Sequence, residues 1–378
     1  MESLSPRETL ARASRLVVKI GSTVITTSEG EVEEAVLLDL ADQICRLVKQ
    51  GKQVVVVTSG AIRAGRARLG LTSKHLALPD RQAAAAVGQI ELIWRYREVF
   101  GRFDQRIAQV LITQAELSNR QRYHHLRNTL NALLNEHKVI PVLNENDPVS
   151  AEGVQIGEND RLAAVVASKL DADLLLSLSD VDGYYTADPT KDSSAQLIPE
   201  VREITPEMER QAQDTAGLAG RGGMKTKIES AKLAMNAGVT LVIAPGKAPR
   251  IIERILAGEN IGTIFLPGPS KLGSRKRWIG YAARAVGKIV VDEGAKQALL
   301  ERGSSLLPVG ITAVEGSFHS GDMVSVLDAQ GRELARGLVN YGDADLRKIV
   351  GCRTRDIKKH LGHRDFDEAI HRDNLVLL

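Results

Sequence analysis

The chain has 378 residues, of which 43% are hydrophobic and 26% charged, so it is neither a disordered nor a low-complexity polymer. Its 50 Lys and Arg against 47 Asp and Glu leave a net charge of +3, which argues against a protein that mainly coats nucleic acid. Two distant cysteines, Cys45 and Cys352, form no disulfide framework, and no stretch approaches the roughly 18 apolar residues of a membrane span. We expect a cytoplasmic protein of about two domains that makes no membrane contact.

Apolar runs and amphipathic helical patterns alternate along most of the chain. The apolar runs predict buried strands at Leu16–Gly21, Gln53–Ser59, Ile107–Ile112, Val139–Leu143, Leu174–Leu178 and Thr240–Ile243. Apolar residues at helical spacing predict helices at Val36–Val48, Arg81–Val99, Gln121–Glu136, Asn159–Leu170 and Thr226–Ala237. Because strands that alternate with helices form sheets covered on both faces, we predict an α/β fold, a three-layer sandwich around a mostly parallel sheet.

The pattern changes after residue 266. A stretch rich in Pro and Gly begins at Pro267 and breaks any periodic element. Beyond it, short apolar runs between glycine-bearing turns predict strands and one helix: Lys288–Val291, Gly310–Val314, Met323–Leu327 and, for the helix, Lys296–Arg302. We therefore predict a first domain at 1–266, a linker at 267–284 and a second, small, mainly β domain at 285–378.

Open parallel sheets bind ligands at the carboxyl ends of their strands, so polar residues at these ends are candidate site residues. Lys19 lies inside the first apolar run, next to Gly21. It is explained either by a phosphate contact or by a side chain that reaches solvent from an edge strand. Ser59 follows the second strand and precedes a helical pattern, where it contributes to an anion site or acts as a plain helix N-cap.

Further polar clusters follow the later apolar runs. Asn144–Asp147 supplies more polar side chains than a turn needs, and Asn159–Asp160 opens a helix either as ligands or as its cap. Ser179–Asp180 ends the leucine-rich strand. The segment Gly220–Lys227 combines a glycine-rich turn, lysines and a helix start, which is a suitable phosphate cradle. It lacks the Walker A spacing, and no G-x-G-x-x-G motif follows the first strand, which weighs against a dinucleotide dehydrogenase.

In this order, the segments resemble the amino-acid kinase family, and within it the glutamate 5-kinase group. The matching segments are V-V-K-I-G-S at Val17–Ser22, V-V-T-S-G-A-I at Val56–Ile62, P-V-L-N-E-N-D at Pro141–Asp147, G-E-N-D at Gly157–Asp160, S-D-V-D-G-Y-Y-T-A-D-P at Ser179–Pro189 and G-G-M-K-T-K at Gly222–Lys227. The tail resembles a PUA module through V-D-E-G-A at Val291–Ala295 and E-R-G-S-S-L-L-P-V-G-I at Glu301–Ile311. The likeness therefore covers essentially the whole chain.

This resemblance implies an amino-acid kinase fold with a PUA-like domain, and a reaction in which ATP phosphorylates the γ-carboxylate of L-glutamate to L-glutamyl 5-phosphate for proline biosynthesis. It implies Mg²⁺ as the cofactor, L-proline as a feedback inhibitor, a homo-oligomer and hand-over of the product to glutamate-5-semialdehyde dehydrogenase. By matching motif, the implied catalytic residues are Lys19, Lys227 and Asp160, and the implied glutamate site is Ser59, Asp147 and Asn159. The implied ATP site is Lys19, Ser179, Asp180, Arg221, Gly222, Gly223, Met224, Lys225, Thr226 and Lys227. No residue is assigned as a metal ligand.

Two other interpretations stay open. Another kinase of the same fold, such as acetylglutamate kinase or aspartokinase, is the first, although the PUA-like tail and residues 144–147 speak against it. An RNA-binding protein is the second, since PUA modules elsewhere contact RNA. The tail's 13 basic and 14 acidic residues, together with an aromatic content of 3% in the whole chain, argue against a strong nucleic-acid surface.

Overall fold

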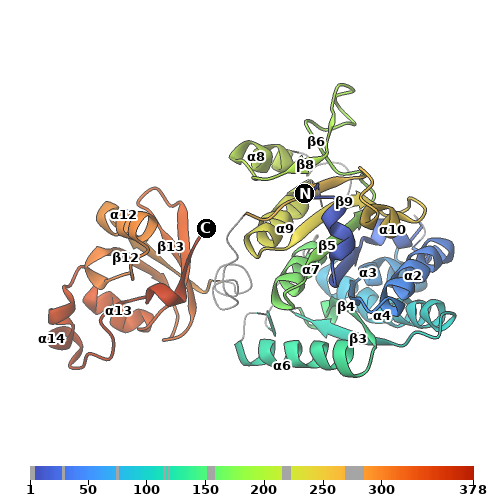
Figure 1. Cartoon of the computed structure of the whole chain (residues 1–378). Helices are drawn as coiled ribbons and strands as arrows, with labels where there is room; N and C mark the ends of the chain where they lie inside the picture. Colours follow the sequence, from blue (N-terminus) through green and yellow to red (C-terminus); the bar gives the residue numbers. More distant parts are fainter. Residues whose placement is uncertain are drawn as a thin grey trace. The chain divides into compact units, whose positions relative to one another are not determined.

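A computed structural model of the chain describes residues 5–27, 30–73, 76–113, 116–117, 120–150, 158–214, 223–268 and 285–378. These residues form two compact units, one with nearly all described residues before 269 and the other with residues 285–378 (Figure 1). The predicted linker limits, 267 and 284, stay a prediction because most of that segment lies outside the described residues. None of the described helices combines the length and the apolar character that a membrane crossing requires.

The first unit is built on a mostly parallel sheet of eight strands in the order β3-β4-β2-β1-β5-β9-β10-β8. The strands are β1 (Arg15–Ile20), β2 (Gln53–Val57), β3 (Ile107–Ile112), β4 (Ile140–Glu145), β5 (Leu174–Ser179), β8 (Glu200–Val201), β9 (Thr240–Pro245) and β10 (Thr263–Phe265). Strand β1 pairs in parallel with β2 on one side and β5 on the other, whereas β10 runs antiparallel to β9. The carboxyl ends of β4, β2, β1, β5 and β9 therefore meet at one edge of the sheet. A separate hairpin pairs β6 (Tyr184–Tyr185) with β7 (Leu197–Ile198).

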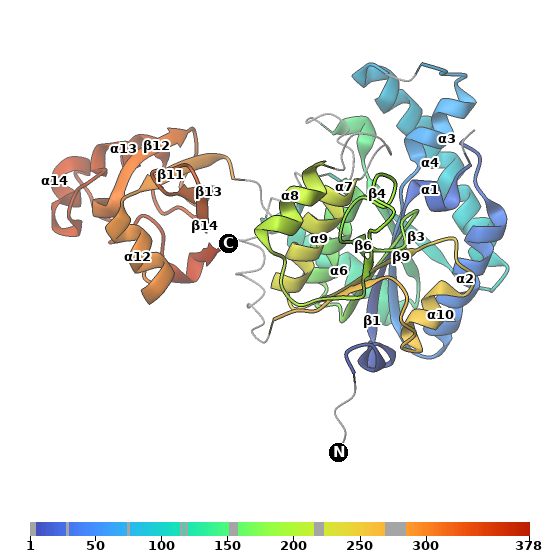
Figure 2. The ribbon, with the colours of Figure 1, turned by 90° about the horizontal axis from the view of Figure 1, so that it is seen from above.

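Helices cover both faces of this sheet, which gives three layers (Figure 1 and Figure 2). They are α1 (Ser22–Ile25), α2 (Glu34–Lys49), α3 (Ala61–Arg68), α4 (Leu78–Gly101), α6 (Arg120–Asn131, followed by a π turn at Ala132–Glu136), α7 (Glu158–Lys169), α8 (Pro206–Asp214), α9 (Met224–Asn236) and α10 (Ile251–Leu256), with short 3-10 turns at Glu8–Arg12 and Asp147–Val149. Leu16, Val18 and Ile20 of β1 join a core with residues of α2 and α4. Because side chains alternate along a strand, Lys19 faces the opposite layer, formed by α7 and α9.

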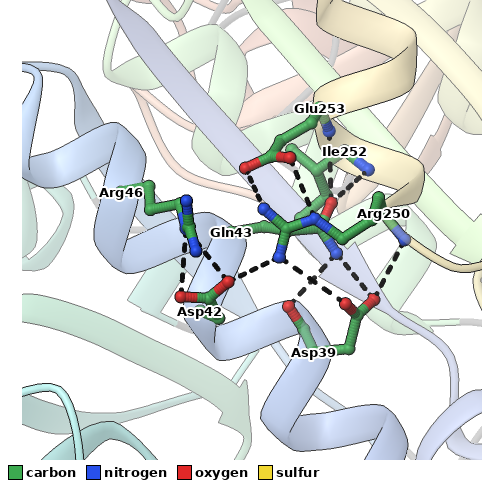
Figure 3. A network of polar contacts seen from close by, with 7 residues as sticks. All are labelled: Asp39, Asp42, Gln43, Arg46, Arg250, Ile252 and Glu253. Atoms are coloured by element: carbon green, nitrogen blue, oxygen red, sulfur yellow. Dashed lines mark hydrogen bonds and ion pairs between the residues drawn. The ribbon is translucent and has the colours of Figure 1, made fainter.

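Helix α10 is fastened to α2 by a group of polar side chains that we call the Arg250 network (Figure 3). Its members are Asp39, Asp42, Gln43, Arg46, Arg250 and Glu253. Buried Gln43 of α2 accepts hydrogen bonds from the backbone amides of Ile252 and Glu253, at 2.8 and 3.2 Å, and so caps the start of α10. The guanidinium of Arg250 pairs with Asp42 at 2.5 Å and also with Glu253. Arg250 has a φ of 53°, in the left-handed region, so this network holds a strained backbone position.

The second unit is a five-stranded sheet in the order β12-β11-β13-β14-β15. Its elements are β11 (Gly287–Val291), α12 (Glu293–Arg302), β12 (Ile311–Gly316), β13 (Met323–Leu327), β14 (Glu333–Leu338), α13 (Asp343–Ile349), α14 (Ile357–Leu361) and β15 (Leu375–Leu377), with 3-10 turns at Pro308–Gly310, Thr354–Asp356 and Arg372–Asn374. The carboxylate of Asp292 accepts a hydrogen bond from the amide of Ala295 at 2.7 Å and caps α12. The unit has its own apolar core, which includes Ile289, Val326 and Leu346.

These elements confirm the predicted fold class, and each predicted strand and helix lies within a few residues of an observed one. The structure adds elements that the sequence pattern did not predict. Strands β6, β7 and β8 have two residues each, which is too short to show a period. Strands β14 and β15 belong to the sheet of the second unit. Strand β10 runs antiparallel to β9, so the first sheet is not wholly parallel.

Candidate active site

Three segments bring charged side chains together at the carboxyl edge of the central strands. Lys19 is the next-to-last residue of β1, Asp160 lies in the first turn of α7, and Lys227 lies in the first turn of α9. Strand β1 is an interior strand, and the Lys19 side chain is only 7% exposed. The interpretation of Lys19 as a solvent-reaching residue of an edge strand is therefore wrong.

Asp160 bridges the two lysines. Its Oδ1 lies 2.6 Å from Nζ of Lys19, and its Oδ2 lies 3.2 Å from Nζ of Lys227. Two hydroxyls also donate to the carboxylate, Thr226 to Oδ2 at 3.2 Å and Ser177 to Oδ1 at 3.5 Å. Asp160 thus binds partners from β1, β5 and α9, so it is more than a cap of α7. We call the three charged residues the lysine–aspartate trio.

The trio is buried and carries unbalanced charge. Two ammonium groups and one carboxylate leave +1, and the side chain of Asp160 is 2% exposed. Burial alone would raise the pKa of Asp160, but the two ammonium groups outweigh it and lower this pKa to about 2. Burial lowers the pKa of Lys19, and Lys227 adds to this effect while Asp160 opposes it. A buried surplus of positive charge is costly to the fold, so the arrangement favours an anionic ligand.

The start of α9 supports the same conclusion. Gly223 is its N-cap residue, and Lys227 follows within the first turn. The free amides make this end of the helix positive, so the helix start and Lys227 together favour negative charge beside them, and Asp160 is an acid that pairs with Lys227 there. Of the other predicted nucleotide-site residues in this segment, Lys225 is exposed and Met224 is half-buried. Arg221 and Gly222 lie outside the described residues.

The end of β5 lies next to the trio. Ser177 is in register with Lys19 on the neighbouring strand. Two residues on, buried Ser179 donates from its hydroxyl to Asp180 at 3.0 Å. Asp180 is exposed, and its charge raises the pKa of Lys19, although burial is the larger effect and lowers it. The structure therefore brings Ser179 and Asp180, both predicted for the nucleotide site, to the same strand ends as the trio.

Ser59 joins the ends of two strands. Its hydroxyl donates to the backbone carbonyl of Ile20 at 3.1 Å, which ties the end of β2 to the end of β1. Gly60, with a φ of 112°, is the N-cap residue of α3. The interpretation of Ser59 as a plain N-cap is therefore wrong. A residue with a Cβ is strained at this φ, which explains the glycine.

A chain of amides follows at the end of β4. Asn144 donates from Nδ2 to Oε1 of Gln89 in α4 at 2.7 Å and accepts from Nδ2 of Asn159 at 3.1 Å. The remaining Oδ1 of Asn159 is buried and has no hydrogen-bond partner within the described part of the chain. Because a buried oxygen without a donor is unfavourable, a ligand donor is a suitable partner for it. Asp147, which is 8% exposed, begins the 3-10 turn after β4.

The predicted site residues that the structure describes thus lie along one edge of the sheet. Ser59 and Asp147 follow β2 and β4, which are neighbours, and the trio lies at β1 and the helices beside it. Asn144 was predicted only as part of the polar cluster that follows the fourth strand, and Gln89 and Ser177, which also hold site residues, were not predicted. A polar residue inside an apolar strand run was an available signal for Ser177. Gln89 offers none, because it lies within a long helix.

Comparison with known proteins identifies the families that the two units match. Residues 14–245 match the amino acid kinase family, and residues 287–361 match the PUA domain. The glutamate 5-kinase of Caldanaerobacter subterraneus subsp. tengcongensis is 47% identical over 364 residues, covering 96% of this chain and 98% of that relative. The glutamate 5-kinase of Geobacter sp. strain M21 is 45% identical over 372 residues, covering 98% of this chain and 100% of that relative.

Among solved structures, an isopentenyl phosphate kinase substrate complex covers 67% of this chain and 99% of that chain, with a TM-score of 0.47 and 19% identity. The family match spans more than half of the chain, and the curated relatives span nearly all of it. The chain therefore belongs to the amino acid kinase family, with a PUA domain after the kinase unit and glutamate 5-kinases as its full-length relatives.

Proposed function

We propose that this chain is a glutamate 5-kinase, which transfers the γ-phosphoryl group of ATP to the γ-carboxylate of L-glutamate. The observation that carries the chemistry is the buried lysine–aspartate trio with its charge of +1. A phosphoryl group in transfer spreads negative charge over its oxygens, and two fixed ammonium groups stabilise that charge where water is excluded. Asp160 holds both ammonium groups in place.

The acceptor needs little activation by the protein. A γ-carboxylate with a pKa of about 4.3 is already ionised at neutral pH, so no general base has to remove a proton. In agreement, all eight histidines lie outside the six segments that resemble the family. The chain's own task is to bring two anions together and to compensate their repulsion.

We propose that Mg²⁺ enters with ATP. The described residues hold no group of three or more His, Cys, Asp or Glu side chains that could form a metal site. Mg²⁺ at kinase sites keeps several waters and is bound largely by phosphate oxygens, so the site needs no protein cage. When bound, it neutralises part of the charge on the phosphates.

The glutamate end of the site is assigned to Ser59, Asp147 and Asn159. A buried carboxylate at Asp147 suits the α-ammonium group of an amino acid, and the unpartnered Oδ1 of Asn159 accepts a second hydrogen bond from it. The nucleotide end is assigned to Ser179, Asp180 and the segment 221–227. Glutamate and ATP then approach the trio from opposite sides.

The test is ADP release with four acceptors: glutamate, N-acetylglutamate, aspartate and UMP. We expect turnover with glutamate and at most a small fraction of it with the other three. Preferred turnover of any other acceptor would contradict the substrate assignment while leaving the kinase assignment intact.

We also propose that L-proline inhibits at or beside the glutamate position. Glutamyl phosphate is an acyl phosphate that cyclises or hydrolyses readily, so control and prompt hand-over to a reducing enzyme belong at this step. Proline carries the same α-amino and α-carboxyl groups but no γ-carboxylate to accept phosphate. A grid of glutamate and proline concentrations tests this: competition is expected, and inhibition that glutamate cannot relieve would require a separate site.

The second unit is assigned no part in the chemistry. It has its own core, and the trio lies wholly in the first unit. We propose that the boundaries are those predicted from the sequence, 1–266, 267–284 and 285–378. A chain ending near residue 284 should therefore keep glutamate-dependent ADP formation, and its loss in a folded truncation would assign the second unit a direct role.

A further inference from the structure

The hairpin of β6 and β7 projects from the first unit (Figure 1), and one buried hydroxyl holds it at its base. Thr263, the first residue of β10, is 0% exposed. Its Oγ1 accepts a hydrogen bond from the backbone amide of Tyr184 in β6 at 2.7 Å and donates to the carbonyl of Ile198 in β7 at 2.6 Å. Each strand of this hairpin has only two residues, and so short a hairpin is marginal by itself. Contacts such as those of Thr263, one to each strand, therefore decide where the hairpin lies.

Gly183, the residue before β6, packs tightly against the same hydroxyl. A Cβ added at Gly183 would lie 2.6 Å from Oγ1 of Thr263 and 2.7 Å from Cδ1 of Leu197, which is closer than side chains pack. The backbone of Gly183 is outside the left-handed region, so close packing rather than φ explains this glycine. Gly183 ends the segment S-D-V-D-G that begins at Ser179. The contact with Thr263 thus fixes the far end of the loop that carries Asp180.

Thr263 also lies in one row of the sheet with the first lysine of the trio. Lys19 of β1 is in register with Ser177 of β5. Ser177 is in register with Ile243 of β9, and Ile243 with Thr263 of β10. Residues opposite each other on paired strands point to the same face, so Thr263 faces the same layer as Lys19. Three strand spacings of about 4.8 Å place Thr263 roughly 14 Å from Lys19. An extended nucleoside triphosphate has about this length from its γ-phosphate to its base.

We propose that Thr263 is a positioning residue for the nucleotide, because it holds the β6–β7 hairpin and the Asp180 loop at the end of the site that takes the adenosine part of ATP. With the γ-phosphate at the trio, the rest of the nucleotide extends along this row toward the hairpin. Thr263 acts through the hairpin backbone, since its buried hydroxyl already donates one hydrogen bond and accepts another. The inference rests on the proposed function and assigns a residue to the nucleotide end of that site.

Arg7 keeps the backbone beside Thr263 in place. Its guanidinium donates to the carbonyl of Gly262 at 3.0 Å and to that of Pro199 at 2.8 Å. These residues are the chain neighbours of Thr263 and Ile198. Strand β10 is also paired on both sides, with β8 and with β9. Loss of the Thr263 hydroxyl should therefore release the hairpin without shifting β10.

The first test compares Thr263→Val, which keeps the shape of the side chain but removes its hydroxyl, with Thr263→Ser, which keeps the hydroxyl. Isothermal titration calorimetry measures binding of ATP with Mg²⁺ to the full-length chain without glutamate. Thr263→Val should raise the Kd by on the order of 10-fold, because two buried backbone groups lose their partner. Thr263→Ser should stay within about twofold of the wild type, because both hydrogen bonds remain. Thr240→Val is the matched control, at the half-buried first residue of β9 on the opposite edge of the sheet, and should bind as the wild type does.

Steady-state kinetics separate positioning of the nucleotide from a general loss of structure. In Thr263→Val the KM for ATP should rise by on the order of 10-fold, in parallel with the Kd. The KM for glutamate and kcat should change far less, because the trio still places the γ-phosphate. An equal rise of both KM values would overturn the proposal, since a general loss of structure affects both substrates.

Gly183→Ala repeats the test from the hairpin side and serves also if Thr263→Val does not fold. It sets a Cβ against the Thr263 hydroxyl, leaves the sequence of β10 unchanged and should likewise raise the Kd for ATP. A wild type that bound no ATP would contradict the proposed function together with this inference. Wild-type binding with an unchanged Kd in folded Thr263→Val or Gly183→Ala would overturn the inference alone.

Discussion

Two networks of the first unit each join basic and acidic side chains, but one network is buried and the other is partly exposed to solvent. The lysine–aspartate trio is buried, with side-chain exposures of 7%, 2% and 6% for Lys19, Asp160 and Lys227. The Arg250 network is half-exposed, with side-chain exposures of 35% for Arg250 and 23% for Asp42. One network carries surplus positive charge inside the protein, and the other neutralises its arginine near solvent.

This difference distinguishes a network that serves the reaction from one that fastens helix α10 to helix α2. In the Arg250 network each charge is screened by water, so the network adds modest stability and fixes where α10 begins. The positive charge of Lys19 does not help the fold, because burial lowers its pKa by more than the contact with Asp160 raises it. Its position at the carboxyl ends of parallel strands is where a phosphate supplies the missing negative charge. A buried, unbalanced network therefore marks the chemistry better than the number of ion pairs does.

The largest contrast is expected from removing the acid of each network. Asp160→Asn removes the carboxylate that pairs with both buried ammonium groups and should lower the free energy of unfolding by about 3–5 kcal/mol, with loss of turnover. Asp42→Asn is the matched control and should lower it by about 1 kcal/mol or less, with normal turnover. Urea unfolding monitored by circular dichroism measures both. Equal destabilisation by the two variants would remove the distinction.

A second buried acid, outside the trio, tests whether burial alone marks a residue for phosphoryl transfer. Asp147→Asn removes the charge assigned to the glutamate ammonium group and should raise KM for glutamate by on the order of 10-fold or more, since a charge-assisted hydrogen bond is lost. The KM for ATP and kcat should change far less. Steady-state kinetics with each substrate varied separates the two. An equal loss for both substrates would point to a structural role.

The pH dependence of stability follows from the low pKa of Asp160. Its folded pKa of about 2 lies below the ordinary 3.8, so the carboxylate contributes stability that is complete above about pH 4 and lost as pH falls toward 2. The difference in unfolding free energy between wild type and Asp160→Asn should therefore be constant from pH 7 to 5 and shrink below pH 4. A difference that grew on acidification would contradict the sign.

The smallest effect is expected in the Arg250 network. Arg250→Ala removes the ion pairs and keeps the left-handed backbone, so it should lower the free energy of unfolding by about 1–2 kcal/mol. Arg250→Gly removes the same ion pairs but relieves the strain at φ 53°, so it should be the less destabilising of the two. Thermal unfolding distinguishes them, and kcat should be unchanged in both. If Gly were clearly worse than Ala, the backbone would not be strained.

The sequence predicts features that depend on neighbouring residues better than contacts between residues that are distant in the chain. The β1 run and the lysine inside it were predictable, because a buried strand needs apolar neighbours and Lys19 is not one. That Lys19, Asp160 and Lys227 belong to one site was available only through family resemblance, since the three residues come from distant segments. The support of Asn144 by Gln89 had no local signal at all. Very short elements such as β8 exist only because neighbouring strands hold them.

The central claim is that the two lysines of the trio serve phosphoryl transfer rather than the fold, and kcat of Lys19→Ala tests it most directly. Glutamate-dependent ADP release at saturating substrates should fall by on the order of 100-fold or more, the scale of losing one preorganised charge contact. Lys247→Ala, which removes an exposed lysine paired with Glu33, is the matched control and should keep full activity. Near-normal turnover in folded Lys19→Ala would contradict the account.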